Sequence, residues 1–489
     1  MSDSTPSAPS SALSARGDST GHAAPSTGAA ATGDGASPPA SPSPAAEASL
    51  DEDAPPPDGA SLREGFTTGS ALAAAATAAL RLLLRGGRAA TVSVPLPPFS
   101  SSEDHDAPAG WLDVPVAEAT LVAPVHMGAG AAVGAVVKDG GDDPDATHGA
   151  RIEALVECAG EGTALPEIGA TPQAGGVSRA GAPNVPDLLL AFPFDAPSRA
   201  ATGAAASCPP PIPASSSGVT VLLRGGAGVG LVTLPGLPVA VGEPAINPEP
   251  RRQLAFAIHH ECAAAGWRGT VRVTARVPEG QRIARHTLNP RLGIVGGISI
   301  LGTRGTVRPY SHDAWQAAVA QGLDVARAAG LTEVCLSTGR RSETLLMCAH
   351  PALPPLAFVQ AADFAAFSLA AAAQRGFTRV AWGCFFGKLV KLAQGLPHTH
   401  AHTAPLDLPL LAQWALDAGA GKAACAHIAA ANTAGQALEI LLADPAHPTV
   451  LRHVAERARA AAHRWTGGTE TVTVTVHLFH LDGRCLVTA

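Results

Sequence analysis

The sequence predicts an α/β protein in three parts: a disordered N-terminal tail, an N-terminal α+β domain of the two-layer, sandwich-like type, and a Rossmann-like βα domain. Residues 1–60 are rich in Ser, Pro, Ala and Gly without apolar periodicity, so they cannot bury enough surface to offset the entropy lost on ordering. Alternating strand patterns dominate residues 218–308. From His312 onward, short apolar strands alternate with loops and helices, as in a parallel doubly wound sheet. We therefore expect the two domains to span residues 61–308 and 309–489.

Composition excludes several classes of protein. A formal net charge of -7 over 489 residues argues against nucleic acid as a general partner. The eight cysteines are scattered without a C-x-x-C pair, which fits reduced thiols and not a disulfide framework. No apolar run reaches the roughly 18 residues of a membrane span, and the N-terminus lacks a signal-peptide pattern. We expect a soluble cytoplasmic protein with no membrane partner, and a homo-oligomer is compatible with the sequence.

The first ordered segment is Leu62–Ser70 (LREGFTTGS), which leads into an alanine- and leucine-rich run that predicts a helix at residues 71–84. Ser70 or Thr68 can cap this helix, and Gly86 can end it. A Thr-Thr-Gly-Ser turn at a helix N-terminus suits an anion, because free amides and the helix dipole both face it. An ordinary capped helix has the same pattern, so both interpretations stay open.

Two low-complexity insertions are predicted in the N-terminal domain. Residues 98–113 are rich in Ser, Pro and acidic side chains and follow a strand predicted at residues 91–96. Residues 158–217 are rich in Ala, Pro, Gly and Ser, apart from a short apolar stretch at Asp187–Phe194. We expect both regions to be loops.

Between these insertions, a predicted strand at Val133–Val137 leads into the loop Lys138–Gly149, which holds four aspartates, a lysine and a histidine. Carboxylates at this density can bind a hard cation, cap a helix or supply a base. Their spacing does not match an EF-hand loop. A loop of aspartates that cap their own backbone is the alternative interpretation.

A local basic segment runs from Arg282 to Pro309. It contains five arginines (Arg282, Arg285, Arg291, Arg304 and Arg308) and no acidic residue. Within it, Ile294–Leu301 is apolar and interrupted by glycines, which predicts a short buried strand. Arginine forks and glycine-loop amides would suit an anionic ligand. Solvated arginines on a surface loop are the alternative.

In the C-terminal domain, two loops follow predicted strands, at Ser337–Glu343 and at Gly383–Gly387. Ligands of parallel sheets bind at the carboxyl ends of strands, so we expect these loops to form a site. The second loop is not a P-loop, because it has three residues between its glycines and Leu389 at the Ser/Thr position. Farther along, His398, His400 and His402 share one face of an extended chain and could bind a metal, or could simply form hydrogen bonds.

Taken together, these motifs resemble one family, the CbiD-type cobalt-precorrin-5B C1-methyltransferases of anaerobic cobalamin synthesis. The matching segments occur in family order across about residues 62–415, and several are long and rich in Gly, Asn and Pro. They are LREGFTTGS (62–70), SVPLP (93–97), KDGGDDPDATHGA (138–150), GVGLVTLPGL (228–237), GEPAINPEPR (242–251), NPRLGIVGGISILGTRGTVRP (289–309), TGRRSE (338–343) and GKLVKLAQG (387–395).

The resemblance implies methyl transfer from S-adenosyl-L-methionine to ring carbon C1 of cobalt-precorrin-5B, giving cobalt-precorrin-6A. It implies that cobalt arrives only as part of the corrinoid substrate, so no metal bound by the protein itself is expected. The acetate and propionate arms of that substrate would account for the basic segment. Two other functions remain open: a corrinoid-binding protein without catalysis, and a metal-dependent hydrolase built on the aspartate loop and the histidines.

Within this framework we expect three groups of site residues. Asp142 and His148 are the candidates for proton handling. The methyl donor would lie against Ser337, Thr338, Gly339, Gly383, Gly387 and Lys388. The corrinoid would lie against Thr67, Thr68, Asp139, Asn289, Arg291, Arg304, His398 and His400.

Overall fold

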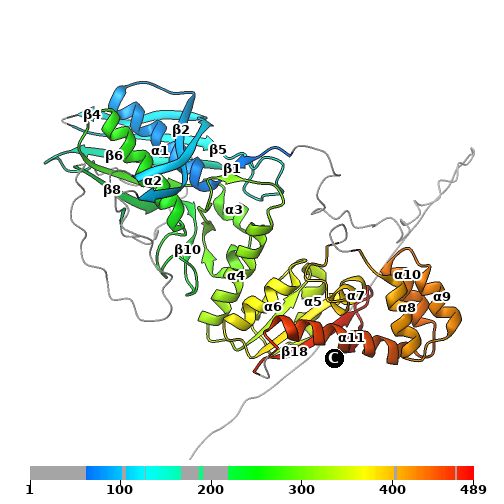
Figure 1. Ribbon diagram of the computed structural model, residues 1–489. Coiled ribbons are helices and arrows are strands. Elements are labelled where there is room, and N and C mark those ends of the chain that lie inside the picture. Colours follow the sequence, from blue (N-terminus) through cyan, green and yellow to red (C-terminus); the bar gives the residue numbers. More distant parts are fainter. Residues whose placement is uncertain are drawn as a thin grey trace, which may run out of the picture. The chain divides into compact units, whose positions relative to one another are not determined.

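The computed structural model describes residues 62–101, 106–126, 128–166, 187–190, 218–400, 405–468 and 471–489. It is a mixed α/β structure (Figure 1), which confirms the predicted class at that level. The predicted tail, most of the predicted insertion at residues 158–217, and His402 lie outside the described residues.

A six-stranded sheet forms the core layer of the N-terminal half, with the strand order β4-β5-β6-β11-β8-β7. Neighbouring strands are antiparallel except β11 and β8, which are parallel. The strands are β4 (Glu118–His126), β5 (Ala129–Val137), β6 (Arg151–Gly160), β7 (Leu188–Leu190), β8 (Val219–Gly225) and β11 (Gly269–Arg276).

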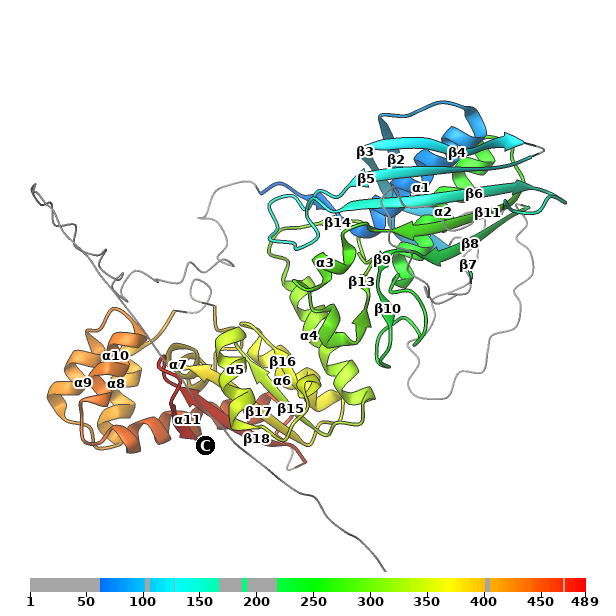
Figure 2. The same ribbon diagram turned by 180° about the vertical axis from the view of Figure 1, so that it is seen from behind.

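Two helices, α1 (Thr68–Arg85) and α2 (Pro248–Ala264), cover one face of this sheet, as Figures 1 and 2 show from opposite sides. The alanines of α1 are almost all buried, and the helix lies very close to β5. A Cβ atom at Gly134 would lie 1.9 Å from the carbonyl oxygen of Ala75, so only glycine permits this approach. The small side chains of α1 and the missing side chain at Gly134 together allow the helix to pack closely against β5.

The predicted loop insertion at residues 98–113 is wrong. β2 (Thr91–Ser101) and β3 (Asp106–Pro115) form an antiparallel hairpin that continues through the prolines, with a register shift between Leu96 and Phe99. Proline is tolerated in a two-stranded ribbon where its missing N–H would point away from the partner or at an irregularity. Proline content alone therefore did not distinguish this hairpin from a loop.

Short strand pairs connect distant segments of the N-terminal half. β1 (Gly65–Phe66) pairs with β14 (Thr306–Val307). The predicted single strand at Ile294–Leu301 is wrong: it consists of β12 (Ile294–Val295) and β13 (Gly297–Ile298), separated by Gly296 at φ 81°. These two pair with β10 (Leu231–Val232) and β9 (Gly228–Val229), respectively. The same region contains α3 (Gly280–Ala284) and the 3-10 helix η1 (Asn289–Leu292).

The C-terminal half contains a five-stranded sheet with the order β16-β15-β17-β18-β19. The first four strands are parallel, and β19 pairs antiparallel with β18. The strands are β15 (Glu333–Ser337), β16 (Phe358–Gln360), β17 (Arg379–Phe385), β18 (Thr473–Phe479) and β19 (Cys485–Thr488). Parallel pairing and the strand–loop–helix alternation agree with the sequence, whereas β19 was not predicted.

Helices surround this sheet and extend beyond it (Figure 1). They are α4 (His312–Ala328), α5 (Arg340–Ala349), η2 (Pro355–Ala357), α6 (Ala365–Gln374), α7 (Phe386–Ala393), α8 (Leu408–Asp417), α9 (Lys422–Ala429), α10 (Ala434–Leu442) and α11 (His447–Trp465). None of the helices in the described ranges is both long enough and apolar enough to cross a membrane.

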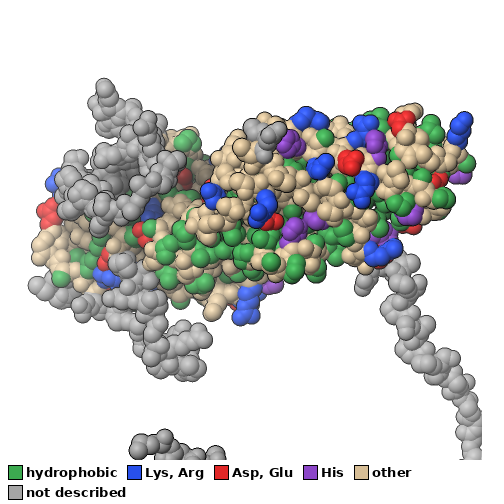
Figure 3. Space-filling model, turned by 90° about the horizontal axis from the view of Figure 1, so that it is seen from below, with side chains coloured by type: hydrophobic (Ala, Val, Ile, Leu, Met, Phe, Trp, Pro, Cys, Tyr) green, Lys and Arg blue, Asp and Glu red, His purple; other side chains and the backbone are tan. Residues whose placement is uncertain are grey.

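The apolar cores follow the two sheets. One large cluster fills the space between α1, α2 and the six-stranded sheet, and another surrounds the parallel sheet. A third, smaller cluster joins Val232, Leu292 and Ile294 to Val325 of α4. This cluster contains residues from both sides of the domain boundary predicted at residue 309, and that boundary stays a prediction. Figure 3 shows basic and histidine side chains scattered over one face of the described residues, without a continuous basic stripe on that face.

Candidate functional site

A cavity of about 590 Å³ lies at the carboxyl ends of β15 and β17. We call it the sheet-edge cavity. Four of the six residues predicted to bind the methyl donor line it: Thr338, Gly339, Gly387 and Lys388. The remaining lining residues are Arg340, Arg341, Ser342, Phe385, Lys391, Thr399, Leu406, Asn432, Thr433 and Ala434.

The other two predicted donor residues lie behind the cavity. Ser337 is fully buried at the end of β15, and its hydroxyl has no hydrogen-bond partner. Gly383 is inside β17, where an added Cβ would lie 3.1 Å from side-chain atoms of Leu346 and Phe479. The next residue, Cys384, is fully buried, and burial raises the pKa of its thiol to about 12. A thiolate nucleophile is therefore not available there.

The lining of the sheet-edge cavity is strongly basic. It includes four cationic side chains and no carboxylate, and the first residues of α5, α7 and α10 border it. Helix N-termini carry partial positive charge and free amides, which adds to the field of the side chains. The cavity is therefore suited to the negatively charged end of a small molecule.

Two of these cations have hydrogen-bond partners in the chain, one a carboxylate and the other a pair of backbone carbonyls. Lys388 donates to Asp363, which also accepts a 2.7 Å hydrogen bond from the Thr399 hydroxyl. Burial acts to raise the pKa of Asp363, but Lys388 and the hydroxyl outweigh it and lower that pKa. Buried Lys391 donates to the carbonyl oxygens of Thr399 and His400, at 3.1 and 3.0 Å. The chain at residues 399–400 is thereby fixed against α7.

The predicted substrate histidines lie beside this chain segment. The His398 ring stacks on His312 and meets Phe364 edge to face, with centroid distances of 5.3 and 4.8 Å. Burial lowers the pKa of His398, which favours the neutral imidazole. His400 contributes its backbone carbonyl to Lys391. Among the described residues, no group of three or more His, Cys, Asp or Glu side chains could hold a metal ion.

Three separate sequence motifs meet at β1 in the N-terminal half. The Arg63 guanidinium binds both oxygens of Asp139, and its backbone N–H donates to Asp142 at 2.6 Å. Hydrogen bonds from Arg63 and from the Gly141 amide lower the pKa of Asp139 to about 2. On the other side of β1, Arg308 pairs with Glu64. We call the exposed and partly exposed residues of these three segments (Arg63, Asp139, Asp142, His148, Arg304 and Arg308) the β1 surface.

Two of the four aspartates in the loop accept from its own backbone, as the self-capping interpretation predicted, whereas Asp142 and Asp143 accept from the backbone N–H groups of Arg63 and Tyr310 outside the loop. Asp139 accepts from the Gly141 amide, and Asp145 accepts from the amide and hydroxyl of Thr147. His148 accepts a 3.0 Å hydrogen bond from the Gly140 amide at Nδ1, so the proton of the neutral ring is on Nε2. The Nε2 atom remains for contact with a ligand, because the side chain is 55% exposed.

Several residues predicted to bind the corrinoid instead have structural contacts. Thr67 caps α1, and Thr68 exchanges hydrogen bonds with the backbone of Leu301, so the helix N-terminus is covered by the chain's own loop. Asn289 donates to the Gly297 carbonyl and accepts from Ser299. Thr67, Thr68 and Asn289 are all buried. The capped-helix interpretation therefore describes this turn.

Four of the five arginines of the basic segment form ion pairs, which the sequence did not predict. Arg282 pairs with Glu279, Arg291 with Glu343, Arg304 with Asp313 and Arg308 with Glu64. These carboxylates lie just outside the segment or far along the chain. The segment is therefore less basic than its composition suggested, although the side chains of Arg282, Arg304 and Arg308 are all more than half exposed.

Sequence reasoning missed the part of the cavity wall formed by Leu406 and Asn432–Ala434. Thr433 caps α10, accepting from the Gln436 amide, so a capping signal was present. Nothing local showed that this cap faces the loops after β15 and β17. Arg63 was also missed, although it belongs to the first motif.

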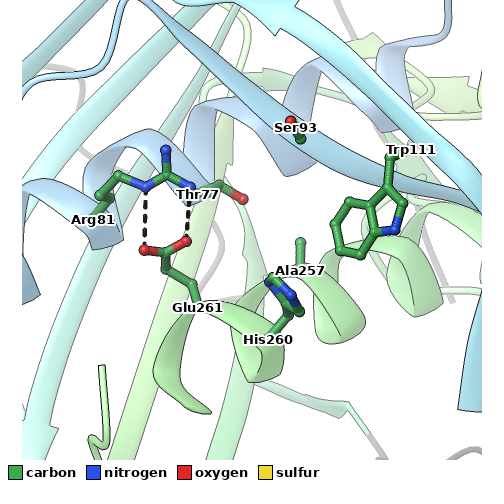
Figure 4. A pocket seen from close by; sticks show the side chains of 7 residues that line it. All are labelled: Thr77, Arg81, Ser93, Trp111, Ala257, His260 and Glu261. Atoms are coloured by element: carbon green, nitrogen blue, oxygen red, sulfur yellow. Dashed lines mark hydrogen bonds and ion pairs between the residues drawn. The ribbon is translucent and has the colours of Figure 1, made fainter. Parts of the chain in front are cut away.

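A second cavity, of about 460 Å³, lies on α1, α2 and the β2–β3 hairpin (Figure 4). Arg81 forms a bidentate ion pair with Glu261, and the Trp111 and His260 rings lie 4.8 Å apart. Figure 4 shows the ion pair and the two rings on different sides of the cavity. Its charged groups neutralise each other, so the sheet-edge cavity is the better candidate for an ionic ligand.

Comparison with known proteins identifies the family. The CbiD family model matches residues 56–184 and 209–309, and the model of the CbiD C-terminal domain matches residues 398–489. The chain belongs to the CbiD family. The interruption at residues 185–208 falls within the region that we predicted to be an insertion.

Relatives in the CbiD family have a named activity. The cobalt-precorrin-5B C(1)-methyltransferase of Nitratidesulfovibrio vulgaris is 56% identical over 432 residues, covering 88% of this chain and 94% of the relative. The enzyme of the same name from Geobacillus kaustophilus is 38% identical, covering 77% and 81%. The crystal structure of the cobalamin biosynthesis protein CbiD from Archaeoglobus fulgidus is 22% identical, covers 68% of this chain and 79% of that one, and has a TM-score of 0.29.

Proposed function

We propose that this CbiD protein is a cobalt-precorrin-5B C1-methyltransferase, which transfers a methyl group from S-adenosyl-L-methionine to C1 of the corrinoid and forms cobalt-precorrin-6A. The observation that carries the proposal is the 56% identity to the Nitratidesulfovibrio vulgaris enzyme along 94% of its length. Cobalt belongs to the substrate in this reaction.

The sheet-edge cavity is our candidate for the methyl-donor site. Its volume of about 590 Å³ falls within the range of roughly 300–1,000 Å³ that is typical of small-molecule sites. It also lies at the carboxyl edge of parallel strands, where the chain order of β15, β16 and β17 reverses direction, as in Rossmann-like folds. S-adenosyl-L-methionine supplies an electrophilic methyl group on a sulfonium ion.

The cations of the cavity suggest how the donor is oriented. A sulfonium is positive, so four basic side chains would repel it, whereas they would attract the carboxylate of the same molecule. We therefore expect Lys388 and the first residues of α5 and α7 to hold the carboxylate. The methyl group would then face away from these cations.

The β1 surface is our candidate for the corrinoid site. Arg63, Arg304 and Arg308 can meet the carboxylate arms of the ring, since all three side chains are more than half exposed. His148 and Asp142 are the proposed groups for moving a proton, with His148 acting through Nε2. The ring carbon itself is the nucleophile, so the protein contributes chiefly by positioning the two reactants.

The compartment and the assembly are proposals of the same kind. Seven cysteines in the described ranges are free thiols, which supports a reducing compartment, and we place the reaction in the cytoplasm. A homo-oligomer stays a prediction that light scattering of the purified protein would test.

The decisive experiment is incubation of the purified protein with cobalt-precorrin-5B and a donor labelled in its methyl group. Label must enter the corrinoid, and the product must match cobalt-precorrin-6A by mass. Binding of the corrinoid without incorporation of label would instead identify a non-catalytic corrinoid-binding protein.

A further inference from the structure

One buried carboxylate, Glu343 of α5, joins the segment after β15 to η1 in the preceding half of the chain. Both oxygens of Glu343 accept hydrogen bonds from the Arg291 guanidinium, each at 2.7 Å. A third bond, also 2.7 Å, comes from the side-chain amide of Gln360. The Glu343 side chain is only 5% exposed, whereas that of Arg291 is 39% exposed. The carboxylate is thus fully surrounded, and the arginine covers it from the solvent side.

Glu343 belongs to the helix that borders the sheet-edge cavity. It lies in the first turn of α5, and its amide donates to the carbonyl of Gly339 at 2.9 Å. The preceding residue, Ser342, lines the cavity and exchanges a hydrogen bond with Thr338. Gln360 ends β16 directly opposite Ser337 in the sheet. These hydrogen bonds connect the position of the Glu343 carboxylate to the conformation of the loop that follows β15.

Arg291 comes from the other half of the chain, and its backbone belongs to a tightly packed segment. It lies in η1, which ends at Gly293 in the left-handed region, with φ 70°. A Cβ at Gly293 would lie 2.4 Å from Leu234, so the turn fits tightly against that segment. The neighbouring Leu292 is part of the small apolar cluster that includes Val325 of α4. The guanidinium is therefore presented to Glu343 from a packed element.

The pairing also satisfies both partners. Planar guanidinium and carboxylate groups match in two parallel hydrogen bonds, the strongest arrangement that these groups form. A buried carboxylate that loses its cation is strongly unfavourable, so Glu343 retains Arg291 unless a competing anion brings compensating contacts. Arg291 is accordingly a poor candidate for a corrinoid anchor, although the sequence suggested that role.

We propose that Arg291 is a positioning residue, which acts through Glu343 to hold the β15–α5 loop in the shape that binds the methyl donor. The inference rests on the proposed function for the identity of the ligand. The sequence-based hypothesis predicts that changing Arg291 weakens corrinoid binding. The positioning role predicts that the same change weakens methyl-donor binding.

A double-mutant cycle separates these hypotheses. The variants are Arg291→Met, Glu343→Gln and the double variant, with Arg375→Met, Asp324→Asn and their double as the matched control on a bidentate pair whose carboxylate is 44% exposed. S-adenosylhomocysteine, which binds without reacting, reports donor-site affinity by calorimetry. Steady-state methyl transfer gives separate KM values for donor and corrinoid, together with kcat.

If Arg291 acts through Glu343, each single variant weakens donor-site binding about tenfold and the double variant is no worse than either one, a coupling of about 1.4 kcal/mol. The corrinoid KM stays within twofold of the wild-type value in all three. Arg291→Lys, which keeps the charge but cannot form two parallel bonds, should fall between wild type and Arg291→Met. The control variants should leave donor-site binding unchanged.

Other results overturn the proposal. A higher corrinoid KM with unchanged donor-site affinity would return Arg291 to a corrinoid-binding role, and additive effects of the two single variants would show that they act independently. Hydrogen exchange provides a readout that does not depend on the reaction: Arg291→Met should speed exchange at the start of α5, and unchanged exchange there refutes the positioning role. If the wild-type protein transfers no methyl group while α5 loosens as expected, the proposed function fails and the structural link stands.

Discussion

Lys138 is the most deeply buried cation of the aspartate loop, and changing its partner gives a sharp test of how that loop is held. The Lys138 side chain is 1% exposed, and its ammonium lies 2.5 Å from Asp145, which is 24% exposed. In Asp145→Asn, the amide oxygen can still accept from the Thr147 amide and hydroxyl. The amide nitrogen, however, would face the ammonium with two donors. The substitution therefore removes the charge pair and leaves the rest of the turn in place.

The expected cost follows from burial. Removing one partner of a buried ion pair costs about 3–5 kcal/mol, and the partial exposure of Asp145 places this case near about 3 kcal/mol. That energy corresponds to a roughly 150-fold increase in local opening. Hydrogen exchange can measure it at two amides that close the loop: Gly149 donates to the Lys138 carbonyl, and Lys138 donates to that of Ala150. Both amides should exchange roughly 150-fold faster in the variant.

Two further variants test whether the unpaired Lys138 ammonium causes the faster exchange. Asp324→Asn removes a carboxylate that is 44% exposed and paired with Arg375, and we expect it to change exchange at the loop by less than about twofold. Adding Lys138→Met to Asp145→Asn removes the unpaired ammonium, so protection should largely return. Unchanged exchange in Asp145→Asn would refute the reasoning. Equal loss with and without Lys138→Met would show that geometry, and not the buried charge, holds the loop.

Three other predictions follow from single contacts. Gly302→Ala would place a Cβ 2.5 Å from Thr67, at a residue with φ 137°. Gly296 also has positive φ but has open space around it, so Gly296→Ala is the control. Urea denaturation should show that Gly302→Ala lowers the free energy of unfolding by about 1–3 kcal/mol more than the control does. Lys388→Met removes a cation from the sheet-edge cavity, and should weaken S-adenosylhomocysteine binding roughly tenfold or more in calorimetry, whereas unchanged affinity would contradict the proposed orientation. Burial, together with the nearby His350 imidazole, lowers the pKa of His477 to about 4 from 6.5. The unfolded chain therefore binds a proton at His477 before the folded protein does, and the free energy of unfolding falls by about 3 kcal/mol as the pH falls from 6.5 toward 4. His477→Asn should flatten that part of the stability-versus-pH curve measured by denaturation, and an unchanged slope would contradict it.

The sequence predicted best those features that are set by local pattern. Each strand–loop–helix unit of the parallel sheet has its own apolar run, turn residues and helix formers, and parallel pairing follows because such units join strands by crossovers. The loops after β15 and β17 were accordingly predicted to share a site, and Thr338, Gly339, Gly387 and Lys388 line the same cavity. The approximate position of the site therefore follows from topology alone.

Features set by distant contacts could not be predicted in the same way. The basic segment contains no acidic residue, yet Arg291 is paired with Glu343, 52 positions along the chain, and Arg308 with Glu64, 244 positions away. Charge counted along the sequence takes no account of such partners. The hairpin at residues 91–115 was missed for a related reason, since the pairing of its second strand outweighs the turn signal of its prolines.

The contacts that organise both proposed binding surfaces share one arrangement, in which a buried or half-buried charge joins two motifs that are separate in the sequence. Arg63 joins the first motif to the aspartate loop, and Glu343 joins the loop after β15 to η1. The buried Glu343 pair is strongly unfavourable to break, whereas the exposed Arg63–Asp139 pair adds little net stability but holds its two motifs in one arrangement through two hydrogen bonds. An enzyme that works by holding two reactants in line gains from this property, because a loop displaced by about 1 Å can cost a hundredfold in rate. We therefore infer that these ion pairs contribute more to the precision of the site than to the stability of the fold, so that substitutions there should lower activity at temperatures where the protein is still folded.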